Sequence, residues 1–470
     1  MKDIPLSSNK ANDFSSLNLN ADLLKNLSSL GYQTMTPIQA LSLPDIIAGK
    51  DVIGQGKTGS GKTAAFGLGL LEKLNVKRFR IQSLILCPTR ELADQVAKEI
   101  RKLARAIHNI KVLTLCGGTP FGPQIGSLEH GAHIIVGTPG RVEEHVIKGT
   151  LKLDDLEILI LDEADRMLEM GFQAALDNIV ERSPKQRQTL LFSATYPQQI
   201  QTIAKNIMVN PVMAKVESTH DDSSIKQHFY KVEDTEQRLL AVRLLLMSHN
   251  PQSAVIFCNT KKETQEVADQ LHDYGFSVLA LHGDLEQRDR DQTLIRFANK
   301  SVAVLVATDV ASRGLDIDDL DAVINYHIAR DSEIHVHRIG RTGRAGSKGI
   351  ACSLFSDKES YKVGLLEDYL DQVIDGESLP DLSVLDQQPI SGKMATIQID
   401  GGKKQKVRPG DILGALTGEN GIKGSQVGKI SVLDNWAYVA VEKIALKLAL
   451  RKLEKGKLKG RTFRVRHLNG

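Results

Sequence analysis

The chain has 470 residues, which is too long for one ordinary hydrophobic core and predicts two to four domains. Its composition, 41% hydrophobic and 25% charged with a net charge of +3, is typical of a soluble globular protein. The sequence has no apolar run of the roughly 20 residues that a membrane helix needs, and MKDIPLSSNKANDF at its start has no apolar signal-peptide core, so we expect a cytoplasmic protein without a membrane partner.

Cysteine usage fits the same compartment. Cys87, Cys116, Cys258 and Cys352 are far apart and form no CxxC pair. This pattern is typical of reduced thiols and offers no metal site. We predict that the four cysteines act as small buried hydrophobic residues.

Short apolar runs that end in small or polar residues recur through residues 50–360, with helix-like stretches between them. Continuous runs of β-formers are typical of buried strands in parallel sheets, and their alternation with helices predicts a doubly wound α/β fold. Because ligands bind at the carboxyl ends of such strands, the polar residues there should form a working surface. The runs include 82–89, 133–140, 156–165, 188–195, 253–260, 277–284, 302–309 and 321–326.

The pattern divides the chain into three domains and two linkers. A first α/β domain is predicted over 1–212 and a second over 225–378, joined by the polar stretch 213–224. A second linker is predicted over 379–393. In 394–469 the order changes to strand, helix, strand, strand, helix and strand, which matches the small α+β fold of the RNA recognition motif.

The stretch GQGKTGSGKT contains a phosphate-binding P-loop by its glycine spacing. A predicted strand precedes it and a predicted helix follows it, so backbone N–H groups would converge on phosphate at a helix N-terminus. Lys62 can reach the β- and γ-phosphates, and Thr63 can ligate Mg²⁺. The predicted nucleotide-binding residues of the loop are Gly56, Lys57, Thr58, Gly59, Ser60, Gly61, Lys62 and Thr63.

The run LEILILDEAD supplies the acid that such a site needs. Asp162 ends the apolar run and would hold Mg²⁺ together with Thr63. Glu163 follows it and is suited to polarise water as a general base. An isolated acidic pair is more often a solvated helix start, but the P-loop and the apolar strand favour the catalytic interpretation.

Four segments resemble motifs of the DEAD-box RNA helicases: PTRELA at 88–93, DEAD at 162–165, SAT at 193–195 and HRIGRTGR at 337–344. The resemblance covers about residues 14–360, because the motifs recur in family order at suitable separations. It implies two domains like the core of the RecA recombinase, ATP hydrolysis, and RNA binding across both domains.

The resemblance also identifies the nucleotide as ATP. In GYQTMTPIQ, which resembles the family's Q motif, Gln39 would read adenine, since an amide can both donate to and accept from the edge of the base. Phe14 would stack on the base, and Asp316 would meet the ribose. Arg341 and Arg344 would act as arginine fingers on the γ-phosphate, and their spacing of three allows them to share one helix face.

Further motifs imply coupling and RNA contacts. Ser193 and Thr195 would couple the nucleotide site to RNA, although their hydroxyls suit helix capping equally. Arg313 would support the domain interface. Small residues let the RNA backbone approach, and arginines contact phosphates. The RNA contacts implied for the core are Pro88, Thr89, Arg90, Gly117, Gly118, Thr138, Pro139, Gly140, Arg141, Thr260, Gly283, Gln287, Arg290, Thr308 and Asp309.

This division of motifs implies that the ATPase site is complete only when the two core domains close on each other. RNA that spans both domains favours the same closure, so ATP and RNA should bind cooperatively. By the resemblance, the closed state bends one strand of a short duplex and dislodges its partner.

Residues 391–470 contain 17 Lys and Arg and 6 Asp and Glu, a balance of +11 against −8 for the rest of the chain. A basic C-terminal domain favours a polyanion, although charge alone also fits a solvated surface. The segment IDGGKKQKVRPGDILGALTGENGI resembles the RNA-binding domain of the DbpA group of bacterial helicases. That resemblance implies binding to a 23S rRNA hairpin in the peptidyl-transferase region and a role in large-subunit assembly; we expect a monomer.

The aromatic residues of this domain allow two interpretations. DNWAYVAV aligns with the RNP1 octamer and places Trp436 and Tyr438 on one strand face, where bases would stack. The octamer lacks its leading basic-Gly pair, and the strand MATIQID has no aromatic residue, so packing against a helix or linker is an equal alternative. Basic residues are the stronger candidates for phosphate contacts: Lys403, Lys404, Lys406, Arg408, Lys423, Lys457, Lys459, Arg461, Arg464 and Arg466.

Three functions are compatible with these motifs. The leading hypothesis is an RNA-stimulated ATPase that separates short RNA duplexes. An ATP-switched RNA clamp without productive unwinding would use the same motifs. A DNA motor is disfavoured by the C-terminal domain, which resembles an RNA-binding module.

Overall fold

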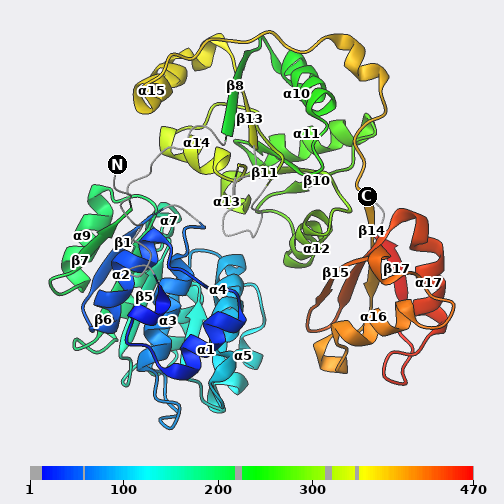
Figure 1. Ribbon diagram of the computed structural model, residues 1–470. Coiled ribbons are helices and arrows are strands. Elements are labelled where there is room, and N and C mark those ends of the chain that lie inside the picture. Colours follow the sequence, from blue (N-terminus) through cyan, green and yellow to red (C-terminus); the bar gives the residue numbers. More distant parts are fainter. Residues whose placement is uncertain (1–12, 57–58, 217–224, 313–319, 344–348, 469–470) are drawn as a thin grey trace, which may run out of the picture. The chain divides into compact units, whose positions relative to one another are not determined.

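The computed structural model describes residues 13–56, 59–216, 225–312, 320–343 and 349–468. The chain divides after residue 220 into two compact units (Figure 1). The first contains one parallel sheet, and the second contains a parallel sheet and a small antiparallel sheet. This confirms the predicted fold class of two tandem parallel-sheet domains and a small α+β domain.

Seven strands form the sheet of the first unit in the order β3-β4-β2-β5-β6-β1-β7. The neighbours β5, β6 and β1 bring the ends of DEAD, SAT and the strand before the P-loop to one stretch of the sheet edge. The strands are β1 (Val52–Gln55), β2 (Ser83–Leu86), β3 (Val112–Leu115), β4 (Ile134–Gly137), β5 (Ile158–Asp162), β6 (Gln188–Ser193) and β7 (Val212–Lys215).

Alternate residues of these strands point to opposite faces, so the sheet separates two hydrophobic cores. One core packs under α1 (Ala21–Ser29), α2 (Pro37–Ile47), α3 (Lys62–Lys73) and α4 (Arg90–Leu103). The other packs under α6 (Pro139–Ile147), α7 (Ala164–Glu169), α8 (Gln173–Glu181) and α9 (Gln198–Ile207). The remaining helix, α5 (Phe121–Glu129), has no buried residue.

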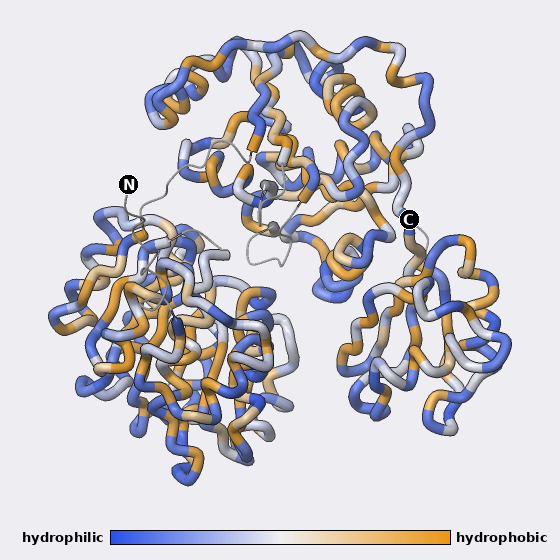
Figure 2. The backbone as a smooth tube through the Cα atoms, in the orientation of Figure 1, coloured by the Kyte–Doolittle hydropathy of each residue, from blue (hydrophilic) through white to orange (hydrophobic). Residues whose placement is uncertain are grey.

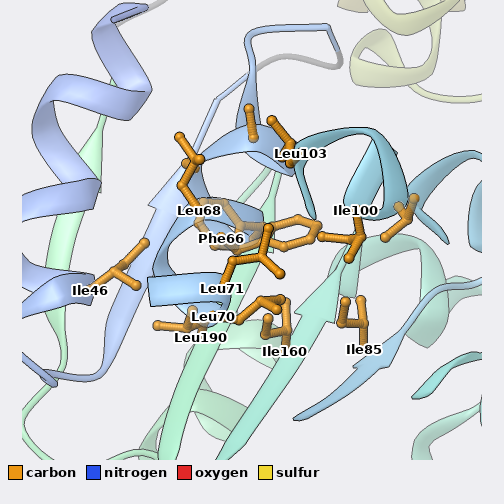
Figure 3. Close-up of a cluster of buried hydrophobic side chains, with 14 of the residues drawn as sticks. Ile46, Phe66, Leu68, Leu70, Leu71, Ile85, Ile100, Leu103, Ile160 and Leu190 are labelled. Atoms are coloured by element: carbon orange, nitrogen blue, oxygen red, sulfur yellow. The ribbon is translucent and has the colours of Figure 1, made fainter. Parts of the chain in front are cut away.

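Helix α3, which follows the P-loop, is held tightly between its neighbours. Figure 3 shows Phe66 and Leu70 of α3 among side chains from α4 and from the central strands. A Cβ atom at Gly69 would lie 2.2 Å from Ile46 of α2, and one at Gly67 would lie 2.8 Å from Ile100 of α4. Glycine at both positions therefore permits the close approach of three helices.

The second unit begins with a six-stranded parallel sheet in the order β10-β11-β9-β12-β13-β8. Its strands are β8 (Ile225–Lys231), β9 (Ala254–Cys258), β10 (Val278–Leu281), β11 (Val304–Thr308), β12 (Ala322–Asn325) and β13 (Gly349–Phe355). Its helices are α10 (Thr235–His249), α11 (Lys261–Asp273), α12 (Gln287–Ala298), α13 (Asp309–Ser312), α14 (Ser332–Ile339) and α15 (Ser360–Leu370).

The C-terminal domain has the predicted βαββαβ order. Its elements are β14 (Met394–Ile399), α16 (Pro409–Thr417), β15 (Val427–Val432), β16 (Ala437–Glu442), α17 (Leu446–Lys455) and β17 (Val465–Leu468). The antiparallel sheet has the order β15-β16-β14-β17, and apolar residues of one face pack on both helices. Figure 2 shows hydrophobic residues concentrated in the interior of each domain, while the connecting loops are mostly hydrophilic.

The first predicted linker is shorter than the sequence indicated, and the second packs against the core of the second unit. Residues 213–215 belong to β7, which pairs with β1 as an edge strand. An edge strand is only partly buried, so it lacks the continuous apolar run by which the inner strands were found. In 379–393, Ile390 is buried in the core of the second unit, and Leu379 and Val384 pack against that core.

The four cysteines are free and buried, as predicted, and burial raises the pKa of Cys116 and Cys352 to about 12. No helix among the described residues is long and apolar enough to cross a membrane. In the same residues, no cluster of His, Cys, Asp and Glu could hold a metal ion.

We predict that Leu70→Ala lowers the free energy of unfolding of the first unit by about 2–5 kcal/mol, because it leaves a cavity under the P-loop helix. The matched control is Leu41→Ala, since Leu41 is half exposed on α2; its effect should stay below about 0.5 kcal/mol. The only tryptophan, Trp436, lies in the other unit. Hydrogen exchange resolved by peptide is therefore the appropriate measurement, and equal protection in both variants would contradict this description of the core.

Candidate nucleotide and RNA sites

The P-loop joins β1 to α3 as predicted, and its residues Lys57 and Thr58 lie outside the described residues. Gly59 and Gly61 have φ angles of +80° and +95°, the left-handed region that favours glycine. A Cβ atom at Gly61 would lie 2.5 Å from Nε2 of Gln39. Position 61 therefore requires glycine for two reasons: its backbone is left-handed, and the side chain of Gln39 lies too close for a Cβ atom.

Lys62 and Asp162 are buried at the centre of this site. Lys62 is the first residue of α3, and its Nζ donates a hydrogen bond to the carbonyl oxygen of Gly56 (2.8 Å). Burial raises the pKa of Asp162 to about 7, and the positive charge of Lys62 opposes the shift. A metal cation beside Asp162 would favour its charged form in the same way as Lys62 does.

Gln39 lies in the first turn of α2, where its amide tethers the P-loop. Its Oε1 accepts from the backbone N–H of Thr36 (2.9 Å), and its Nε2 donates to the carbonyl of Gly61 (3.1 Å). These bonds leave one amide hydrogen and one oxygen lone pair for a base. Phe14 is buried and meets Tyr32 edge-on, with ring centroids 6.3 Å apart; its stacking on adenine stays a prediction.

The DEAD segment turns sharply after β5. Glu163 has φ +53°, a left-handed conformation that is costly for a residue with a side chain and that is concentrated at functional sites. It is buried and precedes α7. Asp165 accepts from the backbone N–H (3.1 Å) and the hydroxyl (3.0 Å) of Thr195. The DEAD and SAT segments are therefore physically linked.

Among the described residues, neither hydroxyl of the SAT segment caps a helix, which disfavours the alternative of simple capping. Thr195 uses its hydroxyl to bind Asp165. Ser193 ends β6 with its hydroxyl buried and without a hydrogen-bond partner among the described residues. A buried unpaired hydroxyl is costly, which is why such groups are concentrated where a ligand or water completes them.

Arg141 is held by the loop that follows β3. Its Nη1 donates to the carbonyl oxygens of Cys116 (3.1 Å) and Thr119 (2.9 Å), and its Nε donates to Glu144 (3.1 Å). The side chain is 11% exposed. Arg141 therefore positions the Gly117–Gly118 turn in this structure, and a contact of its own with phosphate stays a prediction.

Two neighbours of Arg141 were missed by sequence reasoning. Oε1 of Gln124 accepts from Arg141 (3.0 Å) and lies 3.0 Å from Nε2 of His145. Burial lowers the pKa of His145 to about 4, and the ring of Phe121 stacks on it at 4.1 Å. The only signal in the sequence is that His145 follows Arg141 by four residues, which places both on one helix face.

The other predicted RNA contacts of the first unit lie at the same sheet edge. Gly118 has φ +68°, and a Cβ atom there would lie 2.3 Å from Nη1 of Arg90, so the arginine rests on the glycine. Thr89 caps α4 by accepting from Leu92 (3.2 Å). The remaining contacts are found at the ends of β2, β3 and β4 or at the start of α6: Pro88, Gly117, Thr138, Pro139 and Gly140.

The second unit contains an arginine that sequence reasoning did not select. Arg338 is buried on α14, and its Nε (2.6 Å) and Nη2 (2.8 Å) donate to the two carboxylate oxygens of Asp309. It also donates to Asn325 (3.2 Å) and Asn259 (3.3 Å). Asp309, predicted to contact RNA, is therefore engaged in a bidentate ion pair that joins the ends of β9, β11 and β12.

Other predicted residues of the second unit occupy strand ends and helix starts. Thr260 caps α11 by accepting from Glu263 (3.2 Å), and Thr308 accepts from Ala311 (3.3 Å). Gln287 donates to Asp291 (2.8 Å) at the start of α12. Gly283 follows β10, and Arg290 lies in the first turn of α12.

The predicted arginine fingers do not share a helix face, because α14 ends at Ile339 and Arg341 follows it. Gly340 caps α14, so the spacing of three that predicted a shared helix face does not apply beyond it. Arg313, Asp316 and Arg344 lie outside the described residues.

In the C-terminal domain the sheet face with the aromatic residues packs against α12. Tyr438 is 1% exposed, and Arg288 lies over the ring of Trp436 at 4.9 Å. Polar pairs accompany them: Gln292 donates to Gln398 (3.1 Å), and Asn299 donates to Thr396 (2.8 Å). This is the packing alternative, and while it persists Tyr438 offers no ring face to a base.

Most of the basic residues of this domain lie elsewhere and are exposed. Lys403 and Lys404 follow β14, and the segment with Arg464 precedes β17. The backbone N–H of Asp400 donates to the carbonyl of Arg464 (2.9 Å), so the two segments adjoin. Lys406, Arg408 and Arg461 are also exposed, whereas Arg466 is half buried within β17.

Three family models match the chain: DEAD/DEAH box helicase over residues 36–203, helicase conserved C-terminal domain over 236–346 and DbpA RNA binding domain over 396–467. The chain is 53% identical over 456 residues to the ATP-dependent RNA helicase DbpA of Escherichia coli (strain K12), covering 97% of this chain and 99% of that protein. It is 36% identical over 476 residues to the protein of the same name from Bacillus subtilis (strain 168), with coverage of 97% and 99%.

Among solved structures, S. cerevisiae Dbp5 bound to RNA and ADP BeF3 matches with a TM-score of 0.71 at 30% identity, covering 78% of this chain and 96% of that one. The match supports the helicase core, and the family models add the third domain. Together with the linked P-loop, DEAD and SAT segments, these similarities show that the chain belongs to the DEAD-box ATP-dependent RNA helicases and carries the DbpA type of RNA-binding domain.

Proposed function

We propose that this helicase is a monomeric, RNA-stimulated ATPase of the cytoplasm that locally unwinds short RNA duplexes. Its C-terminal domain would direct it to a hairpin in the peptidyl-transferase region of 23S rRNA during assembly of the large ribosomal subunit. The observation that carries the proposal is the end-to-end similarity to the DbpA helicases, which includes the third domain. A helicase core alone would support only a general RNA substrate.

The residues of the first unit fit ATP with Mg²⁺. Among the described residues, the hydroxyls of Ser60 in the loop and Ser193 at the end of β6 are buried without a hydrogen-bond partner. The carboxylate of Asp162 and the hydroxyl of Thr63 are oxygen ligands of the kind Mg²⁺ prefers. Bound Mg²⁺ would supply neutralisation of phosphate charge. Lys62 would leave the carbonyl of Gly56 and bind the phosphates, and Gln39 would use its remaining hydrogen and lone pair on adenine.

Glu163 is the residue we assign to polarise the attacking water. Glu163 directly follows Asp162, is buried, and has a left-handed backbone conformation rather than a helical one. Such strain is concentrated at functional sites. Arg341 and Arg344 of the second unit would stabilise the charge on the γ-phosphate in the transition state. Asp165 and Thr195 would relay the state of this site to the RNA-binding edge of the same unit.

For rRNA recognition we assign the exposed basic segments rather than the sheet face. Lys403, Lys404 and Arg464 lie on adjoining segments and are exposed, so they are open to phosphate contacts. Such contacts supply affinity and positioning. The sheet face is engaged with Arg288 and Gln292.

An ATP-switched RNA clamp is the second candidate, since the same residues would serve it. A strand-displacement assay on a short duplex beside the rRNA hairpin separates the two functions. Displacement that requires ATP supports unwinding, and ATP-dependent retention without displacement supports the clamp. If double-stranded DNA stimulates the ATPase as well as rRNA fragments do, the RNA assignment is wrong.

We predict that Glu163→Gln reduces steady-state ATP hydrolysis by about 10²-fold or more, the usual contribution of a general base. Glutamine keeps the shape of the side chain, so binding of ATP and RNA should be retained in filter-binding assays. Glu181→Gln, at an exposed position on α8, is the matched control and should hydrolyse ATP normally. Normal turnover in Glu163→Gln would remove Glu163 as the base.

Gln39→Ala should weaken ATP binding about ten-fold, the effect of one or two lost hydrogen bonds. The change also frees the carbonyl of Gly61, so the P-loop loses a tether. Calorimetry with ATP and GTP measures both effects, with Gln173→Ala on the surface of α8 as control. Equal use of ATP and GTP by the unaltered protein would contradict adenine reading by Gln39.

Deletion of residues 391–470 should leave RNA-stimulated ATPase activity but abolish the preference for one rRNA segment. The cut keeps Ile390, which is buried in the second unit. Because the deletion uncovers the polar side chain of Asn299, a folded double variant, Lys403→Ala with Lys404→Ala, should show the same loss of preference. Competition between the rRNA hairpin and an unrelated hairpin is the measurement, and an unchanged preference in both proteins contradicts the targeting role.

A further inference from the structure

Helix α15 is apolar on two faces, although only one face is covered. Val363 and Leu366 are buried and pack with Phe229 and Phe355 of the second unit. The helix lies at the outer side of that sheet domain in Figure 1. A surface helix normally presents polar residues opposite its buried stripe.

The other face carries large hydrophobic side chains at every fourth position. Tyr361, Leu365 and Tyr369 are 67%, 58% and 50% exposed, and Val373, beyond the helix end, is 81% exposed. We name these four residues the α15 stripe. Spacing of four places side chains above one another on a helix, and eight residues extend over about 12 Å. Single exposed hydrophobics are ordinary, but a continuous row marks an interaction surface.

Acidic residues border the α15 stripe. Asp368 lies next to it on the helix, and Asp371 and Asp375 follow. Residues 360–381 contain six Asp and Glu against one lysine, Lys362. Partial burial raises the pKa of Tyr369, and the nearby carboxylates of Glu333 and Asp331 at the start of α14 raise it further. The negative border therefore comes from two helices.

The negative charge of this border distinguishes among possible occupants of the α15 stripe. RNA would be repelled by the acidic border, which has the wrong sign for phosphate contacts. A second copy that paired α15 with α15 symmetrically would bring like charges together. An apolar row with an acidic border is complementary to a helix that has an apolar row and basic flanks.

We propose that the α15 stripe binds a basic amphipathic helix of a partner protein. Hydrophobic residues of the partner at four-residue spacing would pack on Tyr361, Leu365 and Tyr369, and its flanking Lys and Arg would face Asp368 and Asp331. No residue of the stripe belongs to the assigned ATP or RNA contacts. The surface thus adds a protein-docking function to the second unit without competing for those residues.

The test uses the full-length chain and a fluorescent synthetic peptide of about 18 residues, which spans about 27 Å as a helix. The peptide has leucines at four-residue spacing and lysines on both flanks; a second peptide of the same composition scrambles the order, and a third replaces lysine by glutamate. Fluorescence anisotropy should show binding of the first peptide and about ten-fold weaker binding of the other two.

Variants then locate the site. Leu365→Ser and Val373→Ser should each weaken the amphipathic peptide about ten-fold, as loss of an apolar anchor does. Asp368→Lys should weaken it most at low salt. Ile147→Ser is the matched control, because Ile147 is a 60% exposed hydrophobic residue on α6. RNA-stimulated ATPase activity should be unchanged in all four variants, which also verifies their folding.

Three outcomes would overturn the proposal. Equal binding of the ordered and scrambled peptides would show non-specific charge attraction. Self-association in sedimentation that disappears in Leu365→Ser would identify a second copy as the occupant. Loss of RNA binding in Leu365→Ser, with the fold intact, would identify the stripe as an RNA surface.

Discussion

The parallel order of β5, β6 and β1 is the constraint on which the ATPase site depends. Parallel strands end at one edge, so neighbours in this order bring Asp162, Ser193 and the P-loop together although the chain separates them widely. The ion and hydrogen-bond chemistry is then local: the charge of Lys62 opposes the rise in the pKa of Asp162 that burial causes, and Asp165 ties the next turn to Thr195. None of these contacts would form if one strand of the three changed its position.

Two arginines near the proposed RNA contacts, Arg141 and Arg338, hold loop ends of the protein in position. Arg141 gives its donors to the carbonyls of the turn that it supports, and Arg338 gives its donors to Asp309 and to two asparagines. Both are almost fully buried, so the planar fork of donors fixes loop ends against one another. The motifs assign Arg141 to RNA and do not select Arg338, whereas the partners of both in this structure are the protein's own backbone and side chains.

Much of the architecture was predictable, because buried parallel strands leave continuous apolar runs and the P-loop spacing is specific. The sequence indicated β1, β2, β4, β5 and β6 by their runs, but not β3 and β7, whose edge positions leave them partly exposed. It also indicated the βαββαβ order, but not which face of that sheet is covered. Tyr438 shows why: the alternation that places it on a face is the same whether a base or Arg288 and its helix lie opposite.

The close packing of α3 against α2 has a consequence for the selection of a nucleotide. Gly69 admits Ile46 of α2 to the surface of α3; Gln39 lies in the first turn of α2, and Lys62 is the first residue of α3. The two helices are packed side by side, and the amide of Gln39 donates a hydrogen bond to the carbonyl of Gly61, the residue before Lys62. This packing therefore fixes the distance between the phosphate-binding loop and the amide of Gln39, for which we propose adenine reading. With Gln39 in its proposed role, the site would select a ligand by the distance from its base to its phosphates as well as by its base. A substitution in the apolar contact between these helices would then alter selectivity without changing a polar atom.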